Sequence, residues 1–177
     1  MADQDASNPN NGASPEQEPQ VAAITQYIKD LSVESPNSPN VFQWQVQPQV
    51  DVQFSINVNR IADEVHEVIL RVNVNAKSDN GAHFLIDLSY AGLFGIRNVP
   101  DEALGPFLLV EAPRLIFPFA RQVIAEAVQN TGFPPLLLEP IDFGAAFIQQ
   151  LEAQQSQQDG SSGNGSGEAP PPGEGQA

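Results

Sequence analysis

The sequence predicts an α+β protein, with a four-stranded antiparallel sheet and two helices packed on one face of the sheet. Two observations lead to this fold class. Four segments alternate apolar and polar residues, which is the period of a half-buried strand: 24–34, 49–59, 65–77 and 82–91. Apolar residues at helical spacing follow only after these segments, in residues 116–127 and 143–151.

Residues 24–34 form the first predicted strand, because their side chains divide between two faces. One face carries Tyr27, Lys29, Leu31 and Val33. The other face carries Ile28, Asp30, Ser32 and Glu34. Two prolines in the following stretch, PNSPN, end this strand.

The next three strands alternate more regularly. The 49–59 segment places on one face Val50, Val52, Phe54, Ile56 and Val58. The 65–77 segment groups Val68, Leu70, Val72 and Val74. Asp79-Asn80-Gly81 then predicts a hairpin turn, because Asn-Gly tolerates positive φ. In the returning 82–91 segment, the inward residues are Ala82, Phe84, Ile86, Leu88 and Tyr90, and the outward residues are His83, Leu85, Asp87 and Ser89.

Prolines and glycines divide the helical region into predicted pieces. Gly105-Pro106 interrupts residues 101–110, and Pro113 interrupts the chain again. The next helix carries an apolar stripe of Ile116, Ala120, Val123, Ile124 and Ala127. Asn130 and Gly132 end that helix. A short terminal helix is expected at residues 143–151, with Phe143, Phe147 and Leu151 on one face.

Polar tails flank the folded region. Residues 1–20 and 152–177 are rich in Gly, Ser, Pro, Gln, Asn and acidic residues and have almost no large apolar ones. Such segments bury too little apolar surface to offset chain entropy, so both are expected to be disordered. One folded domain is expected at residues 21–151, which is long enough for a single hydrophobic core.

The net charge of −15 argues against nucleic acid or an anionic membrane as a direct partner, since both attract clustered cations. It favours a basic partner, or it serves solubility. The absence of cysteine excludes disulfides and Cys-ligated zinc. The N-terminus lacks the basic and apolar regions of a signal peptide, and no apolar run approaches the roughly 20 residues of a membrane helix. A cytoplasmic protein without membrane insertion is expected.

The chain carries no recognisable catalytic motif. His66 and His83 have neither metal-ligand spacing nor a partnered nucleophile, and each is interpreted as a strand residue. The GLFGI stretch lacks the remaining features of a phosphate-binding loop. We therefore expect no enzyme, no cofactor and no metal. A small-molecule carrier would need polar groups converging beside an apolar wall, and the sequence offers none.

The connection between the last two helices is unusually apolar for a surface loop. It contains Phe133, Leu136, Leu137, Leu138 and Ile141 around three prolines, which fix an extended path. Such a segment either packs on its own core or forms one wall of a groove for apolar guests. The groove interpretation has as its walls and floor Leu136, Leu138, Ile141, Phe143, Phe147, Val50, Val52 and Phe54.

Acidic residues define a second candidate surface. Asp30 and Glu34 share a face of the first strand, and Asp87 lies on the outward face of the fourth, beside Leu85. If these two strands are neighbours, the four residues form a flat acidic patch with one apolar anchor. The patch is either a solvated sheet face or a docking surface for a cationic partner.

Several stretches together resemble the SecB family of bacterial protein-export chaperones: KDLSVE, ESPNSPNVFQ, EVILRV, LIFPFAR and GFPPLLLEPIDF. The resemblance extends from Tyr27 to Leu151. It implies a SecB-like fold, with the strands of the sheet in a Greek-key-like arrangement. It also implies a homotetramer, built as a dimer of dimers with helices between two sheets. Trp44 follows Gln43 directly, whereas some family members place a polar spacer before the tryptophan.

The resemblance implies an ATP-independent holdase that binds unfolded secretory precursors in apolar grooves and delivers them to the SecA motor of the Sec translocase. It assigns docking of SecA to Asp30, Glu34, Leu85 and Asp87. Client binding is assigned to Trp44, Val50, Val52, Phe54, Leu136, Leu138, Ile141, Phe143 and Phe147. A SecB-like chaperone dedicated to a single client, such as an antitoxin, would have nearly the same sequence features.

Overall fold

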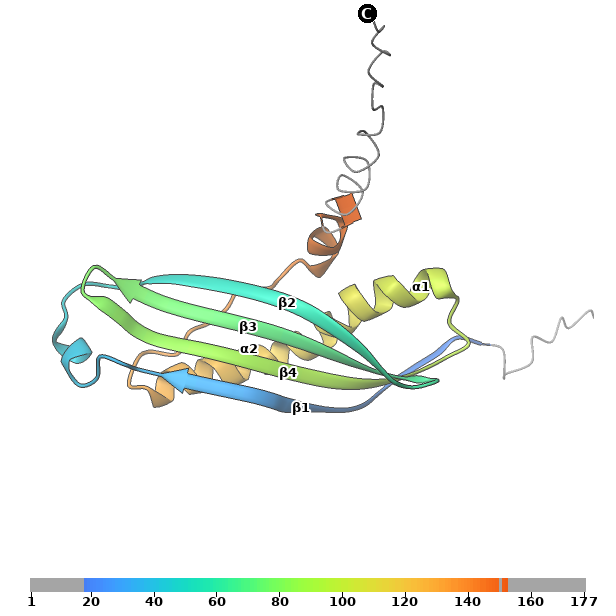
Figure 1. The fold of residues 1–177 in the computed structure, drawn as a ribbon, viewed down its shortest axis with the longest axis horizontal. Coiled ribbons are helices and arrows are strands. Elements are labelled where there is room, and N and C mark those ends of the chain that lie inside the picture. The colour runs from blue at the N-terminus through green and yellow to red at the C-terminus, as the bar shows by residue number, and fades with distance from the viewer. Residues whose placement is uncertain (1–17, 150, 153–177) are drawn as a thin grey trace, which may run out of the picture. The chain divides into compact units, whose positions relative to one another are not determined.

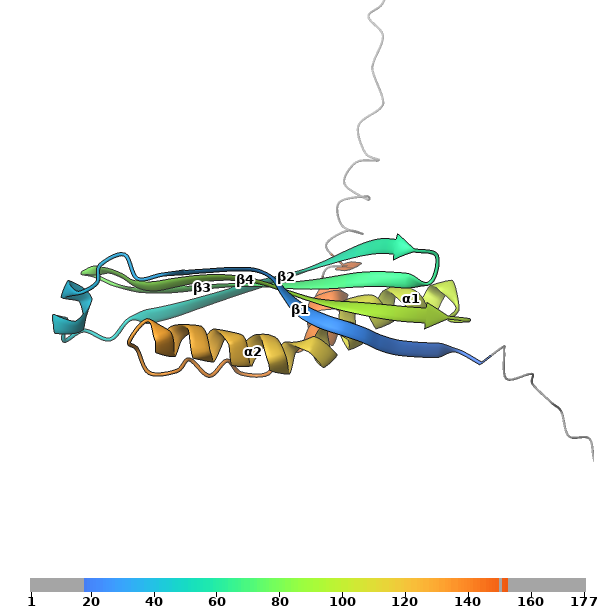
Figure 2. The same ribbon diagram turned by 90° about the horizontal axis from the view of Figure 1, so that it is seen from below.

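The computed structural model describes residues 18–149 and 151–152. The chain divides into two units, Met1–Phe143 and Gly144–Ala177, and each is described by itself. In the first unit a four-stranded sheet forms one layer and a long helix forms the other (Figures 1 and 2). The expected disordered tails lie almost wholly outside the described residues.

The sheet has the predicted Greek-key topology. Its strands are β1 (Gln20–Glu34), β2 (Gln49–Ala62), β3 (Val65–Ser78) and β4 (Gly81–Arg97). Their spatial order is β1-β4-β3-β2, and every neighbouring pair is antiparallel. Three hairpin-connected strands with the remaining strand returned beside the last of them make a Greek key. The α+β class with a four-stranded antiparallel sheet is therefore confirmed.

The predicted faces of β1 are wrong in its middle, because a β-bulge lies there. Ile28 pairs with Tyr90 and Asp30 with Ser89, so Lys29 is an extra residue in β1. An extra residue breaks the strict alternation of side chains. Ile28 therefore shares a face with Leu31 and Val33, while Tyr27 and Lys29 join the acidic residues on the opposite face.

Strand β4 follows the predicted alternation except near its N-terminal end. Phe84, Ile86, Leu88 and Tyr90 are buried as predicted. His83 was expected to point outward, and it is only 3% exposed. The register steps from the Ala76–Phe84 pair to the Lys77–Ala82 pair, which makes His83 a bulge residue. Its ring packs instead against Trp44 and Phe133, with centroid separations of 5.1 and 5.8 Å.

The helical region is continuous, contrary to the predicted pieces. It runs through α1 (Asp101–Pro106), the π-helical segment η3 (Phe107–Glu111) and α2 (Ala112–Asn130). In a regular α-helix the ring of a proline clashes with the carbonyl four residues earlier. The wider π turn, closed by the Ala112 N–H on the Phe107 carbonyl, precedes Pro113 and accommodates it.

This continuity makes the helix longer than the sequence suggested. Asp101–Asn130 spans 30 residues, and by length and composition alone it is long and apolar enough to cross a membrane. Within this fold, however, α2 lies against the sheet of its own chain (Figure 2).

The hydrophobic core lies between α2 and one face of the sheet, here called the inner face. It takes from β3 and β4 Val68, Leu70, Val72, Val74, Ile86 and Leu88, and from α2 Ile116, Phe117, Ala120, Ile124 and Ala127. Helix and sheet approach closely at Gly92, where an added Cβ would lie 2.8 Å from Phe94 and 2.9 Å from Ile116. The opposite face of the sheet is called the outer face.

The second unit contains the terminal helix that the sequence predicted. Residues 143–149 and 151–152 are helical, so this helix begins at the last residue of the first unit. Phe147 lies on this helix and is half-buried. Its assignment as a client contact stays a prediction.

Candidate functional site

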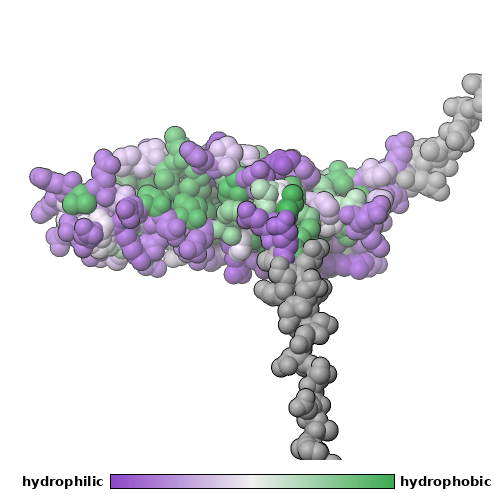
Figure 3. All heavy atoms as spheres, turned by 90° about the horizontal axis from the view of Figure 1, so that it is seen from above, coloured by the Kyte–Doolittle hydropathy of each residue, from purple (hydrophilic) through white to green (hydrophobic). Residues whose placement is uncertain are grey.

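Apolar side chains are exposed on the inner face beside the core helix. Helix α2 packs mainly over the central strands β3 and β4, so several inward residues of both edge strands stay partly exposed. On β2 the exposed fractions are 42% for Val50, 37% for Val52 and 37% for Phe54. On β1 the corresponding residues are Ile28, Leu31 and Val33. Viewed from the β2 edge, apolar side chains gather in a strip between hydrophilic rims (Figure 3).

The proline-rich connection after α2 divides its three leucines between core and surface. Leu137 is 76% exposed, Leu136 is half-buried and Leu138 is only 8% exposed. Arg121 on α2 donates a hydrogen bond to the Leu138 carbonyl at 3.4 Å, which fixes this part of the connection along the helix. The sequence argument that LLL cannot all face inward therefore agrees with the observed burial.

Two predicted client contacts belong to the core instead. Leu138 and Phe143 are both part of the buried cluster, and Phe143 is 1% exposed. The Phe143 ring packs edge-on against Phe54 and Phe117, at centroid distances of 5.7 and 5.8 Å. A buried side chain offers no surface to a guest, so these two residues hold the connection in place. Leu136 and Ile141 are half-buried and pack against the core cluster.

Aromatic residues close one end of the inner face. Trp44 is half-buried and packs edge-on against the His83 ring. Phe42 is 51% exposed and lies 5.4 Å from the Phe133 ring, measured between centroids. Sequence reasoning missed Phe42, and it also left the highly exposed Leu137 out of the site. An aromatic residue two positions before the tryptophan, and the central leucine of LLL, were the available signals.

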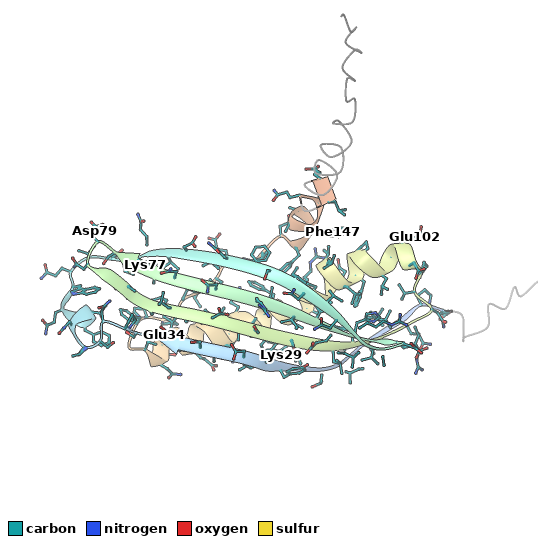
Figure 4. All side chains as sticks on the ribbon, in the orientation of Figure 1. Lys29, Glu34, Lys77, Asp79, Glu102 and Phe147 are labelled. Carbon is teal, nitrogen blue, oxygen red and sulfur yellow. The ribbon has the colours of Figure 1, made fainter. Side chains whose placement is uncertain are left out.

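The four residues of the predicted acidic patch come together on the outer face. β1 and β4 are neighbours, with Glu34 opposite Leu85 and Ser32 opposite Asp87. Glu34, Asp30 and Asp87 are exposed, and Leu85 is half-buried. Together they line a shallow depression of about 340 Å³. Glu34 is labelled at the end of β1, and Lys29 lies further back along the same strand (Figure 4).

A buried carboxylate lies further along the same outer face. Glu67 of β3 is 4% exposed and accepts hydrogen bonds from Lys29, Tyr27 and Asn59. These bonds, led by the one from Lys29, lower the pKa of Glu67 to about 2. The Glu67 bond and burial in turn raise the pKa of Tyr27. The network was not predicted, because the bulge at Lys29 is what brings Lys29 and Tyr27 to this face.

The two histidines do not form a reactive site. His66 is 9% exposed, and burial and the nearby charge of Arg60 lower its pKa. His83 Nε2 is hydrogen-bonded to Ser78 Oγ at 2.9 Å. Among the described residues, no three His, Cys, Asp or Glu side chains are grouped to hold a metal ion.

Exposed apolar strips on one face of a sheet and an acidic opposite face define a protein-binding domain. The family described as Preprotein translocase subunit SecB matches residues 14–154. The chain belongs to this SecB family and is a chaperone of protein export.

Individual relatives agree with the family. The Protein-export protein SecB of Sphingopyxis alaskensis is 54% identical over 90% of this chain and 95% of its own length. That of Zymomonas mobilis is 54% identical over 77% of this chain and 83% of its own length. Among solved structures, a SecB-like chaperone of Mycobacterium tuberculosis, in complex with a peptide from an antitoxin, has a TM-score of 0.56. It is 17% identical and covers 70% of this chain and 90% of its own, so it supports the SecB-like fold alone.

Proposed function

We propose that this chaperone holds unfolded precursor polypeptides, without ATP, on the apolar strips of its inner face. The observation that carries the proposal is the exposure of inward-facing residues on both edge strands, at 37–47% for Val50, Val52, Phe54, Ile28, Leu31 and Val33. Exposed apolar patches of this kind mark interaction sites. Several weak contacts along one extended client give avidity without sequence selectivity.

The proposed client contacts are those that the fold leaves accessible. They include Val50, Val52, Phe54, Leu136, Leu137 and Ile141, with Trp44 and Phe42 at the aromatic end. Phe147 belongs to the same proposal through its place in the predicted groove. Holding a client needs no cofactor or catalytic group. We propose that it takes place in the cytoplasm, where precursors are made.

We further propose that the outer face docks the SecA ATPase, to which the client is handed over. Asp30, Glu34 and Asp87 supply charge that speeds and orients the encounter with a basic surface, and Leu85 supplies the apolar anchor. Clients and motor would then use opposite faces of one sheet. A chain can thus carry a client while it is recognised by the motor.

The proposed assembly is a homotetramer, a dimer of dimers with the helices between two sheets. The apolar stripe of α2, which includes Ile116 and Ile124, packs against the chain's own sheet and is not free for a subunit contact. Leu115 and Phe119 are 54% and 45% exposed and lie one turn apart on α2. These two residues are therefore the proposed contacts between subunits.

Charge reversal on the outer face separates the two activities. Asp30→Lys and Asp87→Lys are expected to weaken SecA binding, because they replace attraction by repulsion, while aggregation of an unfolded precursor is still suppressed. Surface substitutions of this kind usually change stability by less than about 0.5 kcal/mol. The affinity for SecA is measured at low and at physiological salt concentration. Salt screens the charges and should reduce the difference between wild type and the two variants. Unchanged SecA affinity at both salt concentrations would show that the outer face is a solvated surface and not a docking site.

A capture experiment separates general export from service to one client. The tagged chaperone is expected to retain many secretory precursors from its own cell extract. Retention of one protein would favour the dedicated alternative. The relatives named as export proteins are 44–54% identical to this chain, which supports the general role.

A further inference from the structure

An unpaired cation lies within the acidic outer face. Arg71 of β3 stands in one row across the sheet with Ser89 of β4 and Asp30 of β1. It is exposed. Among the described residues, Lys29, Arg60, Arg97 and Arg114 form ion pairs, whereas Arg71 has neither an ion pair nor a hydrogen bond. A guanidinium with acidic neighbours but no partner is available to bind another group.

The surface around Arg71 is hollowed beside the acidic depression. Arg71, Gln53, Ser55, Asn73 and Asp87 line a second depression of about 220 Å³. Asn73 and Asp87 also line the first, so the two depressions adjoin. Asn73 Nδ2 donates to Asp87 Oδ2 at 3.5 Å along their shared border. The outer face therefore has one compartment with carboxylates and an adjoining compartment with a guanidinium.

The distance between the compartments fits an extended peptide. Arg71 is opposite Ser89, and Asp87 is two residues along β4, so Arg71 and Asp87 are diagonal neighbours, roughly 7–8 Å apart between their Cα atoms. Side chains at positions i and i+2 of an extended chain lie on one side, about 7 Å apart. A basic residue over Asp87 would thus place an acidic residue two positions away over Arg71.

We propose that the outer face recognises a mixed-charge segment, in which basic side chains meet Asp30, Glu34 and Asp87 and a carboxylate meets Arg71. The inference rests on the proposed docking of the motor on this face. The planar guanidinium can bind a carboxylate through two parallel hydrogen bonds. The same charge repels a segment that is uniformly basic, so Arg71 selects against unrelated polycations.

The decisive variant is Arg71→Glu, because simple attraction and mixed-charge recognition predict opposite results. It makes an acidic face more acidic, which should tighten the binding of any uniformly basic partner. On the mixed-charge proposal, SecA affinity should instead fall about fivefold or more, because attraction to the carboxylate becomes repulsion. Lys77→Glu is the matched control: it makes the same charge change on β3, six residues or about 20 Å away. Equal or tighter SecA binding by Arg71→Glu would overturn the proposal.

Two synthetic peptides test the ligand chemistry directly. Both are capped at each end and carry Lys residues, and they differ only in a Lys-x-Glu or a Lys-x-Gln spacing. The wild-type chain should bind the Glu peptide about threefold more tightly than the Gln peptide, the effect of one exposed ion pair. In Arg71→Gln this preference should disappear. A preference for Gln, or no preference, in the wild type would contradict the assignment of Arg71.

The result also separates this inference from the docking proposal. Loss of SecA binding in Asp30→Lys with unchanged binding in Arg71→Glu would leave docking intact and reject the mixed-charge segment. No loss in either variant would reject docking on this face altogether. Thermal unfolding of each variant checks that the sheet is preserved.

Discussion

Lys29 Nζ lies 2.8 Å from both carboxylate oxygens of Glu67, although their strands, β1 and β3, are separated by β4. Ala91 of β4, which pairs with Tyr27 of β1 and with Ile69 of β3, is fully buried. Asn59 of β2 donates to the same carboxylate at 3.0 Å. One side chain therefore links three strands, and an edge strand is attached to more than its immediate neighbour.

This link predicts a stability contribution that depends on pH. The folded pKa of Glu67, about 2, is below its ordinary value, so the stabilisation is complete above the ordinary pKa and is lost as pH falls toward 2. Glu67→Gln should lower the free energy of unfolding at pH 7 by on the order of 2 kcal/mol. Urea unfolding of both proteins between pH 7 and 2 measures the difference.

The difference between wild type and Glu67→Gln should shrink across pH 4.5 to 2, where Glu67 of the wild type gains its proton. Lys29→Met serves as a companion variant, because it removes the first donor and leaves the carboxylate. A difference that stays constant down to pH 2 would show that the loss comes from packing and not from the charge of Glu67.

Two adjacent leucines should behave oppositely. Leu138→Ala should cost about 2–5 kcal/mol of stability, because it opens a cavity in the core. Leu137→Ala should change stability by less than about 0.5 kcal/mol and reduce the suppression of client aggregation. Chemical unfolding and light scattering of an unfolded precursor measure the two effects. A Leu137 variant with full holding activity would remove this residue from the client surface.

Two glycines of β4 form a similar pair. Gly92→Ala should destabilise by about 1–3 kcal/mol, because the new methyl group meets Phe94 and Ile116 at less than 3 Å and the helix must shift. Gly95→Ala should cost much less, because its nearest neighbour is Ile24 at 3.6 Å, an ordinary contact. Thermal unfolding compares them, and equal losses would refute the close approach of helix and sheet.

The proposed subunit contact can be tested on the helix. Replacing Leu115 and Phe119 together by Ser should convert the proposed tetramer into smaller species, since both side chains are exposed in the single chain. Native mass spectrometry at micromolar concentration measures the oligomeric state. Gln122→Ser on the same helix is the control, because that side chain is polar and exposed. A tetramer that persists in the double variant would place the interface elsewhere.

Alternation was enough to predict the sheet and its core residues, and it predicted the acidic patch on the condition that the first and fourth strands are neighbours. Val68, Leu70, Ile86 and Leu88 are buried as the period-two pattern requires. The bulges at Lys29 and His83 were not predictable, because they depend on pairing between distant strands. The π turn before Pro113 likewise depends on how the helix fits the sheet. Phe143 was placed in the groove because its ring partners, Phe54 and Phe117, come together only in the fold.

The place of β1 beside β4 has a consequence for the folding of the chain during its synthesis on the ribosome. Residues 20–34 are synthesised first, yet their pairing partner ends at Arg97. At about 5–20 residues per second, translation from residue 34 to residue 97 takes roughly 3–13 s. Strands β2, β3 and β4 are joined by local turns, so this meander can form before β1 pairs with β4. Pairing between segments that are distant in the sequence is the slower step. A ribosome stalled before Leu85, the first residue of β4 that pairs with β1, would therefore display β1 with nothing to pair with, and a chaperone of export would itself briefly be a client.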